Sequence, residues 1–513
     1  MSKITSFKFV TGLAIVLFCS FPMLAKDKKK APNIVFILAD DLGYGDVSCL
    51  NENSKVQTPN IDKLASEGVL FTDAHANAAV CTPSRYGILT GRYAWRSRLR
   101  HSVLMPWEAP LIEDSIATLP EMLKANGYYT ACVGKWHLGW QWNSSDGSVL
   151  SFSDEERFET GYFKLFMKQC RQFSKKINWD EPILKGPTDV GFDYYFGDDV
   201  PNFPPYTWIE NKQFLKKPTE RKPRSMYGDA GLMAPGWQHE QVMPVITEKA
   251  QELIREQSKT EQPFFLYWAL TAPHTPVVPL DDYKGKSGAG LYGDFIVEMD
   301  DFIGKVLATI DSCGIAENTI IIFTSDNGPE YETKDARWGE KPQVAKYGHE
   351  SSYVFRGIKR DIWEGGHRVP MIVKWPAKVK SGKVSNRTVC FTDFMATIAS
   401  MTGVELPDKA AEDSYDFSNE LYWTCKAKKK RKSVLLSGEE YLFAIKKGKW
   451  KFIEGTTNLR NTSLYKLSRP DDILKDALYN LEEDPGEKSN LIEEYPQVAK
   501  ELRDELNKVR NGI

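Results

Sequence analysis

The sequence lacks the cysteine patterns of metal-binding or disulfide-rich proteins. Its eight cysteines in 513 residues show neither paired CxxC spacing nor a dense framework, which argues against a disulfide scaffold or a zinc ribbon. It also lacks an excess of either charge, because 67 Lys+Arg stand against 69 Asp+Glu, for a formal charge of −2. No long-range field therefore draws the protein to nucleic acid, and we expect no nucleic-acid partner. Any anion that the protein handles must be bound at a local site.

Internal repeats and long low-complexity segments are absent as well. With 42% hydrophobic, 27% charged and 12% aromatic residues, the composition is typical of a folded soluble protein. The length is several times the roughly 100 to 200 residues of an ordinary domain. We therefore expect one large domain and one small one.

The N-terminus has the features of a secretory signal. Lys8 precedes an apolar run from Phe9 to Leu24, and Ala25 stands before the charged cluster Lys26–Lys30. This order predicts that residues 1–25 form a signal peptide, so that the mature protein is periplasmic or secreted and keeps no stable membrane insertion. An uncleaved membrane anchor is the alternative, but the run is shorter than the roughly 20 residues that a spanning helix needs.

A lipoprotein anchored through Cys19 is a weaker alternative, because the bulky Phe18 stands where a small residue is expected. Removal of Cys19 with the signal peptide leaves an odd number of cysteines. At least one thiol then has no partner within the chain, and that thiol is a candidate for chemistry.

Continuous apolar runs rich in β-branched residues predict buried strands. The first run, Asn33–Leu38, opens into a polar loop, as a buried parallel strand does. Comparable runs and the helix-like stretches between them lie at Tyr128–Val133, Val245–Gln257, Phe264–Leu270, Leu291–Ser312, Thr319–Thr324 and Val369–Val373. The alternation predicts an α/β fold in which a large, mostly parallel sheet is sandwiched by helices.

The pattern changes after about Gly403. A polar stretch and the basic run Lys426–Lys432 are followed by strand-like pieces around Val434–Leu436 and Trp450–Ile453, and by a helix from about Pro496 to Val509. We therefore place the catalytic domain at residues 31–403 and a smaller α+β subdomain at residues 404–513. The basic run could contact an anionic glycan, although a solvated loop is the favoured interpretation.

Polar residues follow four of the predicted strands. They are Asp40-Asp41, Lys135-Trp136-His137, Asp326-Asn327, and His274, which stands between Pro273 and Pro276. In open α/β sheets, ligands bind beyond the carboxyl ends of the strands. The four groups are therefore expected to converge on one rim of the sheet.

Asp40, Asp41, Asp326 and Asn327 offer hard oxygen donors, which suit calcium or magnesium and not zinc. Taken singly, each pair could be an ordinary loop or helix-capping pair. Adjacent carboxylates repel each other unless a cation lies between them, and both pairs follow a hydrophobic strand. The sequence therefore favours a divalent metal site.

The segment Cys81-Thr-Pro-Ser-Arg85-Tyr-Gly-Ile-Leu-Thr-Gly91 predicts a short helix. Pro83 suits the first turn, and Gly91 suits the C-terminal cap. Cys81 then stands at the helix N-terminus, where free N–H groups and the helix dipole favour an anion, and Arg85 could reach back to the same place. A lone cysteine in that setting is expected to have a lowered pKa. Taken alone, the segment would also fit a buried structural cysteine.

The Cys81-x-Pro-Ser-Arg85 pattern with Leu89-Thr-Gly91 resembles the signature of type I, formylglycine-dependent sulfatases of the alkaline-phosphatase-like superfamily. The Asp-Asp pair, Asp326-Asn327-Gly328 and Trp363–Pro370 resemble further family motifs. Lys446–Lys451 and Leu478–Glu487 resemble the C-terminal subdomain of sulfatases, so the likeness spans about residues 31–491. The resemblance implies that a maturation enzyme oxidises Cys81 to formylglycine (3-oxoalanine). It also implies a calcium ion, with magnesium as the alternative, held by Asp40, Asp41, Cys81, Asp326 and Asn327.

The resemblance further implies that Lys135, His274 and Lys359 contact the sulfate and that His137 assists the formylglycine. A sulfate monoester leaves with negative charge growing on the bridging oxygen, so cations and a proton donor lower the barrier. We assign His274 or Lys359 as the acid and His137 as the base, although the two histidines could be exchanged. Glu364 and Arg368 are interpreted as structural.

Several aromatic residues lie between Gly139 and Gly236, and aromatic faces can stack on sugar rings. We therefore expect a sulfated glycan, of galactose or N-acetylgalactosamine type, from a glycosaminoglycan, a mucin or an algal polysaccharide. His349 is a candidate contact to a sugar hydroxyl. The alternatives are a phosphate or phosphonate ester hydrolase of the same superfamily, which the oxygen-only donor set opposes, and an inactive glycan-binding homologue, which the complete residue set opposes.

Overall fold

A computed structural model of the chain describes Met1, Glu156 and residues 30–100, 102–153, 162–330, 344–422, 431–439, 442–455 and 475–511. The predicted signal peptide after Met1, Cys19 and most of the basic run Lys426–Lys432 lie outside these residues. Pro32–Ile513 forms one compact unit, and Met1–Ala31 is a separate one. Among the described residues, none of the helices combines the length and the apolar character that crossing a membrane requires.

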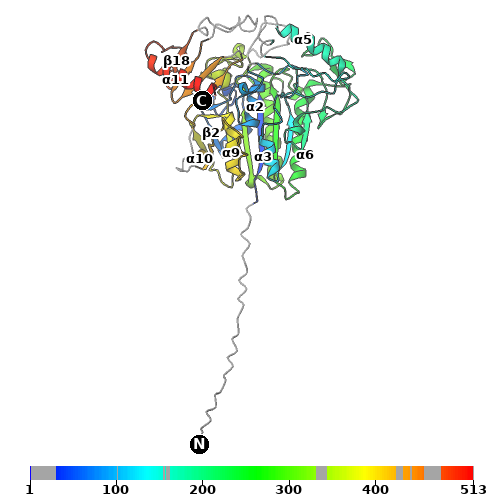
Figure 1. Ribbon diagram of the computed structural model, residues 1–513, viewed down its shortest axis with the longest axis horizontal. Helices are drawn as coiled ribbons and strands as arrows, with labels where there is room; N and C mark the ends of the chain where they lie inside the picture. The colour runs from blue at the N-terminus through cyan, green and yellow to red at the C-terminus, as the bar shows by residue number, and fades with distance from the viewer. Residues whose placement is uncertain are drawn as a thin grey trace. The chain divides into compact units, whose positions relative to one another are not determined.

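A ten-stranded sheet forms the centre of the compact unit (Figure 1). Its strand order is β13-β2-β12-β11-β1-β10-β4-β5-β6-β7. The strands are β1 (Asn33–Asp40), β2 (Val69–Phe71), β4 (Tyr129–Gly134), β5 (Tyr194–Gly197), β6 (Ile209–Glu210), β7 (Gln213–Phe214), β10 (Phe264–Pro273), β11 (Thr319–Ser325), β12 (Met371–Lys374) and β13 (Lys383–Ser385). Strand β1 pairs in parallel with both β10 and β11, and β10, β4 and β5 continue in the same direction. The mostly parallel α/β fold predicted from the sequence is confirmed.

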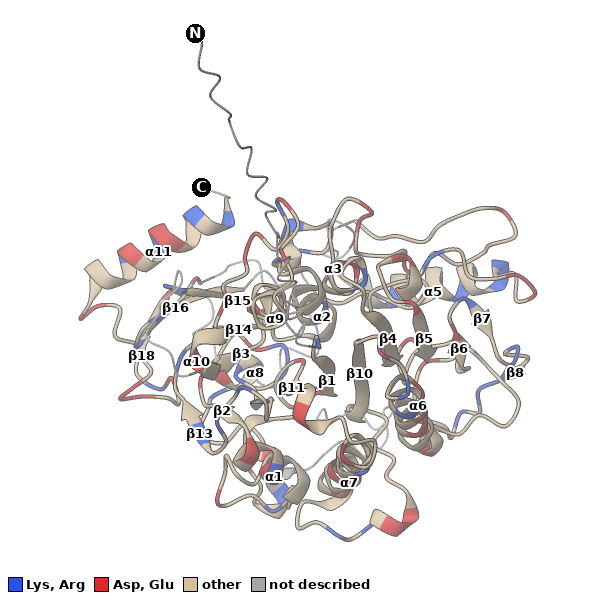
Figure 2. Ribbon diagram, turned by 90° about the horizontal axis from the view of Figure 1, so that it is seen from below, with Lys and Arg blue, Asp and Glu red and all other residues tan. Residues whose placement is uncertain are grey.

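Helices cover both faces of this sheet. Figure 2 shows α1, α6 and α7 on one face and α2, α3 and α9 on the other. Their bounds are α1 (Pro59–Glu67), α2 (Cys81–Thr90), α3 (Leu119–Ala125), α6 (Val242–Gln257), α7 (Gly290–Ser312) and α9 (Phe394–Thr402). Burial on both faces explains why β1 is continuously apolar from Ile34 to Ala39 instead of alternating with polar residues.

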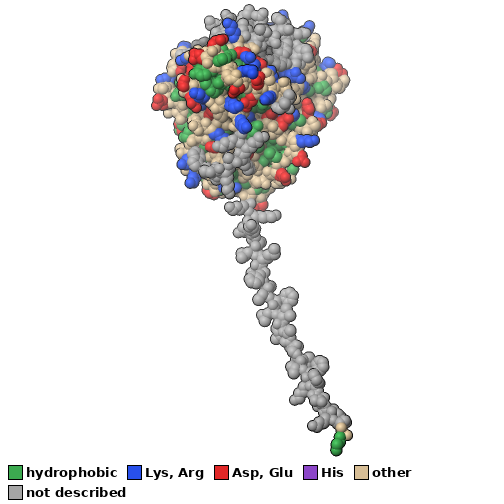
Figure 3. Space-filling view, turned by 60° about the vertical axis from the view of Figure 1, so that its left-hand side comes forward, with side chains coloured by type: hydrophobic (Ala, Val, Ile, Leu, Met, Phe, Trp, Pro, Cys, Tyr) green, Lys and Arg blue, Asp and Glu red, His purple; other side chains and the backbone are tan. Residues whose placement is uncertain are grey.

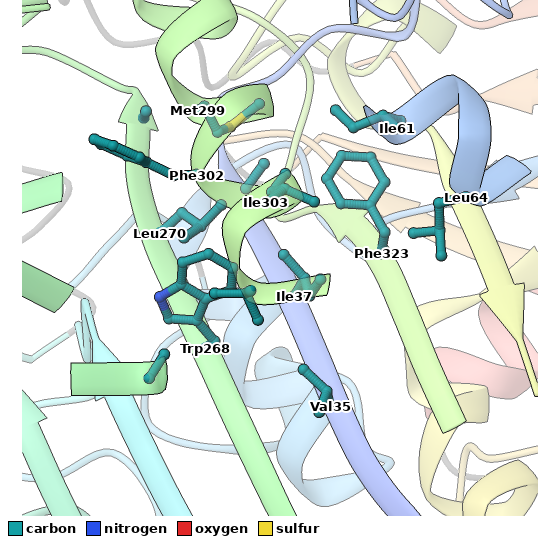
Figure 4. Packing of buried hydrophobic residues seen from close by; sticks show 14 of the residues in the cluster. Val35, Ile37, Ile61, Leu64, Trp268, Leu270, Met299, Phe302, Ile303 and Phe323 are labelled. Carbon is teal, nitrogen blue, oxygen red and sulfur yellow. The ribbon is translucent and has the colours of Figure 1, made fainter. Parts of the chain in front are cut away.

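A large core cluster lies between the sheet and the three helices α1, α6 and α7. Figure 4 shows Ile37 and Trp268, from β1 and β10, packed with Phe302 and Ile303 of α7, while Ile61 of α1 lies close by. All five side chains are almost completely removed from water. This packing fixes the strand ends from which the polar residues project.

The run at Val369–Val373 differs from the sequence prediction. It becomes β12, which pairs antiparallel with both β11 and β2. Gly328, just after β11, donates its N–H to Gly366 O at 2.9 Å, and Gly366 lies just before β12. This bond holds the start of β12 beside the end of β11, so the two strands run in opposite directions. A hydrophobic run predicts burial but not direction, so the parallel assignment of this strand was wrong.

A smaller antiparallel sheet of β15 (Val434–Ser437), β16 (Phe443–Lys447), β17 (Trp450–Ile453) and β18 (Ala477–Asn480) follows. Helix α11 (Pro496–Arg510) packs against it through Ala499, Leu502 and Leu506. The same core includes Tyr93, Ile362, Trp363 and Cys390 from the preceding part of the chain. The boundary at residues 403/404 stays a prediction.

The remaining short elements are α5 (Tyr162–Phe173), α8 (Glu364–His367), α10 (Ser418–Tyr422) and the two-stranded pairs β3 (Ala74–His75) with β14 (Val389–Cys390) and β8 (Glu220–Arg221) with β9 (Leu232–Met233). Basic and acidic side chains are interspersed over the face seen in Figure 3. This mixture agrees with the near-zero formal charge of the chain.

Lys451 of β17 joins the small sheet to helix α8 through a buried charge network. Its Nζ lies 3.1 Å from Glu364 Oε1 and 2.9 Å from Glu487 Oε1, and all three side chains are 0% exposed. Glu487 also accepts the backbone N–H of Glu364 at 2.7 Å. Two buried carboxylates therefore share one ammonium group.

Replacing Lys451 with Ala should lower the free energy of unfolding by about 3 to 5 kcal/mol, because Glu487 would remain buried without a counter-charge and Glu364 would keep only Arg368, at 3.2 Å. Urea denaturation measures this loss. Lys447→Ala is the matched control, since Lys447 lies on the neighbouring strand and pairs with Glu505 at a half-exposed site, where an ion pair contributes at most about 1 kcal/mol. Equal losses in the two variants would contradict the assignment.

Candidate active site

Helix α2 places Cys81 at the rim of the large sheet. Val80, the residue before the helix, is extended, and Gly91 ends the helix with φ of 63°, as its capping role requires. The Ser84 hydroxyl donates to Ala78 O at 2.8 Å and ties the helix start to the preceding segment. The Cys81 Sγ atom lies 3.8 Å from Asp40 Oδ1 and 3.9 Å from Asp41 Oδ1.

The carboxylates predicted to bind a metal gather at this helix start. The Asp41 N–H donates to Asp326 Oδ1 at 3.1 Å, and Asn327 Nδ2 donates to Asp41 Oδ1 at 2.7 Å. Asp41 has φ of 64°, a left-handed conformation that costs energy in a residue with a side chain. The carboxyl ends of β1 and β11 therefore meet beside Cys81.

Three cations balance the three buried carboxylates. Arg85 donates to Asp326 Oδ2 through Nε at 3.0 Å and Nη2 at 2.8 Å, and Nη2 lies 3.3 Å from Asp40 Oδ1. The Lys135 Nζ lies 2.8 Å from Asp40 Oδ2, and the Lys359 Nζ lies 2.6 Å from Asp41 Oδ2. Pairing of this kind is what allows charged groups to be buried. The result is a nearly neutral cluster that carries several positive groups for an incoming anion.

The carboxylates differ in their pKa. Burial raises the pKa of Asp40 to about 7, against the opposing effect of Lys135. Burial also acts to raise the pKa of Asp326, but Arg85 and Lys135 outweigh it and hold that pKa at about 2. Asp326 is therefore the firmly ionised member of the set.

The residues present fit a hard divalent cation. Asp40, Asp41, Cys81 and His274 each offer a ligand atom, and these atoms lie within 4.8 Å of one another. Asn327 Oδ1 is buried and has no hydrogen-bond partner among the described residues, while its Nδ2 is used by Asp41 and Gly328. A buried amide oxygen without a donor is the group that a bound cation would satisfy.

The two histidines of the site hold their protons on opposite ring positions. The Nε2 of His137 lies 3.1 Å from Leu104 O, so this nitrogen carries the hydrogen and the buried Nδ1 is left as an acceptor without a partner among the described residues. The Nδ1 of His274 donates to Thr275 O, which leaves Nε2 facing Asp41 Oδ2 at 3.6 Å. Burial lowers the pKa of both rings well below the usual range, with Lys359 adding to the effect at His274 and Lys135 at His137.

The Cys81 thiol does not have the lowered pKa that its position at the helix start predicts. Burial, together with the negative charge of Asp326, raises its pKa to about 12. The loss of hydration and a neighbouring negative charge therefore outweigh the helix dipole. An unmodified Cys81 would be a thiol and a weak nucleophile at neutral pH.

His349 lies outside the cluster around Cys81. Its Nε2 lies 2.7 Å from Asp46 Oδ1, and its Nδ1 accepts the N–H of Lys55 at 3.3 Å. Asp46 in turn accepts the N–H of Gly43 at 2.7 Å, so His349 supports the loop that follows Asp41. The structure does not bring His349 into the cluster around Cys81, and neither ring nitrogen is left for a sugar hydroxyl.

Two acidic residues at the site were missed in the sequence. Glu330 accepts from Arg360 at 2.8 Å and lies 3.5 Å from Lys359 Nζ. Asp199, which follows β5, accepts the backbone N–H of His137 at 3.2 Å. Both residues stand a few residues after a buried strand, and this place in the sequence is an indication of a site residue. Charged residues of ordinary loops often stand at such places too, so this indication alone could not identify Glu330 and Asp199.

A second group of buried ligand atoms, from His75, Glu364 and His367, is not a metal site. The Lys451 Nζ already lies 3.0 Å from His367 Nε2 and 3.1 Å from Glu364 Oε1, where a cation would bind. The Nδ1 atoms of His75 and His367 are 3.1 Å apart, and His75 Nε2 lies 2.9 Å from Asp73 Oδ1. This cluster is a hydrogen-bonded extension of the Lys451 network, as expected for a structural Glu364.

Comparisons with known proteins agree with this geometry. The Sulfatase family model matches residues 32–404, and a model described as N-sulphoglucosamine sulphohydrolase, C-terminal, matches residues 357–512. An N-acetylgalactosamine-6-O-sulfatase of Bacteroides thetaiotaomicron is 35% identical over 517 residues, which is 97% of each chain. The mouse N-acetylgalactosamine-6-sulfatase is 31% identical over 78% of this chain and 68% of its own length.

A solved Bacteroides thetaiotaomicron structure, described in connection with the metabolism of multiple glycosaminoglycans, is also similar. It superposes with a TM-score of 0.78 at 32% sequence identity and covers 94% of this chain and 100% of its own. Fold, site and sequence thus agree on one family, and the hydrolysis of phosphate or phosphonate esters is not favoured. The chain belongs to the sulfatase family of the alkaline-phosphatase-like superfamily and is a sulfuric ester hydrolase.

Proposed function

We propose that the protein removes sulfate from a sulfated glycan through a formylglycine made from Cys81, with a divalent cation held by Asp40, Asp41, Asp326, Asn327 and residue 81. The observation that carries the proposal is the contact of Cys81 Sγ with Asp40 and Asp41 inside a cluster that also contains Arg85. A hydrated formylglycine supplies two geminal hydroxyls, one to attack sulfur and one to expel the sulfate afterwards. The cation supplies charge neutralisation for the oxygens of the ester.

The chain's own residues supply binding and proton transfer. Lys135, His274 and Lys359 bind the sulfate oxygens and oppose the charge that grows on them. The His137 Nδ1, which is free to accept a proton, is the base that removes a proton from the modified residue 81. Lys359, whose pKa Asp41 raises against the effect of burial, protonates the departing alcohol oxygen, or His274 does so once the negative charge of the bound sulfate has raised its lowered pKa and protonated Nε2.

The substrate is proposed to be a sulfate ester of N-acetylgalactosamine or galactose in a glycosaminoglycan, a mucin or an algal glycan. This choice follows the N-acetylgalactosamine-6-O-sulfatase and the N-acetylgalactosamine-6-sulfatase among the relatives. Calcium is proposed over magnesium because the family resemblance implies calcium, while the carboxylate and amide oxygens suit both ions.

The maturation and the location of the protein follow from the same proposal. Cys81 is buried at 1% exposure in the folded chain. A formylglycine-generating enzyme must therefore reach it before folding is complete. The predicted signal peptide, residues 1–25, would deliver the protein to the periplasm or the outside of the cell.

The proposal is tested by expressing the chain with and without a sulfatase-maturing enzyme. Peptide mass spectrometry across Cys81 and sulfate release from a panel of sulfated glycans are then measured on both preparations. We expect activity only where residue 81 has become formylglycine, with equal folding of the two proteins. An unmodified protein that is fully active would overturn the mechanism, and a modified protein that releases no sulfate from any glycan would overturn the substrate.

Removal of the cation should lower both activity and stability. After chelation, we expect activity to fall to background and to return with calcium more fully than with magnesium. Calcium at about 100 times its Kd should raise the free energy of unfolding by about 2.7 kcal/mol, and Asp326→Ala should abolish this gain. Thermal denaturation with and without the ion measures the effect, and stabilisation that survives Asp326→Ala would place the ion elsewhere.

A further inference from the structure

The active-site cluster meets water on the side of its histidines. Asp40, one of the carboxylates that would hold the cation, is 0% exposed. His137 and Lys359 are each 5% exposed, and His274 is 7% exposed. In the proposed reaction these three residues contact the sulfate ester or the modified residue 81. The sugar that carries the ester therefore lies beyond them, on the side that meets water.

Several aromatic rings between residues 139 and 236 belong to the core and cannot reach a sugar. Trp140, Trp142 and Tyr206 are at most 3% exposed. Trp179 is partly exposed, but its ring centroid lies 5.2 Å from that of Phe214 in the edge strand β7. These rings stabilise the fold, so aromatic content alone does not identify the sugar-binding ring.

Phe203 contacts the site directly. Its ring centroid lies 6.0 Å from that of His137, and the planes of the two rings meet edge-to-face at 84°. Phe203 is also partly exposed. The ring therefore extends from a site histidine to the solvent, at the border of the cluster beyond which the sugar lies.

The chain around Phe203 is fixed on both sides of the ring. Asp199, a few residues earlier, accepts the backbone N–H of His137 through Oδ1 at 3.2 Å. Asn202, the residue before Phe203, accepts the backbone N–H of Asp229 at 2.9 Å. The ring is therefore held in place before a substrate arrives, and a preorganised contact loses less entropy on binding than a mobile one.

A second aromatic ring borders the cluster on the His274 side. Tyr227 shares a hydrogen bond with Thr275, the residue after His274. Burial raises the pKa of Tyr227 to about 12 against the opposing effects of Thr275 and Lys359, so its hydroxyl lies within range of the lysine charge. Tyr227 is partly exposed as well. Phe203 and Tyr227 thus border the same side of the cluster, each next to one of its histidines.

We propose that Phe203 is the platform against which the sugar ring of the substrate lies, and that Tyr227 is a second border of the same sugar site. The inference rests on the proposed function, in which Lys135, His274 and Lys359 bind the sulfate. In galactose and N-acetylgalactosamine the 4-hydroxyl is axial, so the C–H groups at carbons 3, 4 and 5 form one apolar face. The negative face of an aromatic ring attracts such C–H groups. The contact orients the sugar so that its ester points into the cluster.

The test is a series of substitutions at Phe203. Matured Phe203→Tyr, Phe203→Leu and Phe203→Ala are assayed on the 6-sulfates of N-acetylgalactosamine and galactose. Phe203→Ala should lose about 20-fold in kcat/KM, mainly through KM, because both the aromatic contact and the apolar area that it buries are lost. Phe203→Leu keeps apolar area but has no aromatic face, so it should lose about 5-fold. Phe203→Tyr should match wild type.

Inhibition by inorganic sulfate distinguishes a sugar platform from a support for His137. Sulfate binds the same lysines and histidine as the ester but carries no sugar. Its inhibition constant should therefore stay within about twofold of wild type in Phe203→Ala, as expected for sites that do not interact. If Phe203 only held His137 in place, kcat and the inhibition by sulfate would change, and Phe203→Leu would restore both.

Phe214→Ala is the matched control, because Phe214 is also partly exposed but packs on Trp142 and Trp179. It should keep the wild-type KM. Thermal denaturation shows whether each variant is folded, and the comparison of Phe203→Leu with Phe203→Tyr serves if Phe203→Ala is not. An unchanged KM in the folded variants, or an equal loss in inhibition by sulfate, would overturn this inference alone. A correctly matured wild type that is inactive on both sugars would overturn the proposed substrate, and the inference with it.

Discussion

Replacing Cys81 with Ala should lower kcat for sulfate release by at least about 10⁴-fold, since the loss of a nucleophile removes most of the rate enhancement of enzymes that use one. The folded state should barely change. The change removes one sulfur atom whose contacts within the cluster are long, 3.8 and 3.9 Å from the two carboxylates. We expect a loss of about 1 kcal/mol in the free energy of unfolding, typical of a single buried substitution.

Cys390→Ala is the matched control. Cys390 is equally buried, at 1% exposure, but belongs to the core that joins the small sheet to the rest of the chain. Its loss of stability should be similar, and its activity should be that of wild type. Both variants are measured by sulfate release from matured protein and by urea denaturation. Turnover by Cys81→Ala within about tenfold of wild type would show that residue 81 is not the nucleophile.

The gathering of the polar residues at one rim of the sheet could be predicted, because the ends of the strands can be recognised in the sequence. Asp40-Asp41 and Asp326-Asn327 each follow a long apolar run, and parallel strands bring such ends to one rim. The position of Cys81 at a helix start followed from Pro83 and Gly91, and Gly91 does adopt the left-handed conformation of a helix cap. Local pattern and sheet topology were sufficient for these features.

Features that depend on burial were not predictable in this way. The raised pKa of Cys81 results from the packing of the whole rim around the thiol, which a helix-dipole argument ignores. The direction of β12 depends on where the preceding loop is anchored, and His349 is held by Asp46 from a segment about 300 residues away in sequence.

Replacing each of the two site histidines should impair a different step of the reaction. In His137→Ala the base is lost, so the first alcohol should be released in a rapid burst while sulfate release slows by about 10²- to 10⁴-fold. In His274→Ala the burst itself should disappear. Because a proton donor matters most for a poor leaving group, the loss in His274→Ala should be larger on a sugar sulfate than on 4-nitrophenyl sulfate. Rapid-quench measurement of alcohol and sulfate separates the two patterns.

His349→Ala is the control for both variants, because its ring bonds Asp46 and the Lys55 N–H instead of the cluster. It should preserve the burst and the dependence on the leaving group, even if the protein is less stable. If His274→Ala lost the same factor in rate on both esters, the acid would be Lys359 instead. Lys359 holds its proton, because Asp41 outweighs the effect of burial and raises the Lys359 pKa well above its usual range. A burst that survives in His274→Ala but vanishes in His137→Ala would exchange the two roles, against the hydrogen bonds that leave His137 Nδ1 free to accept.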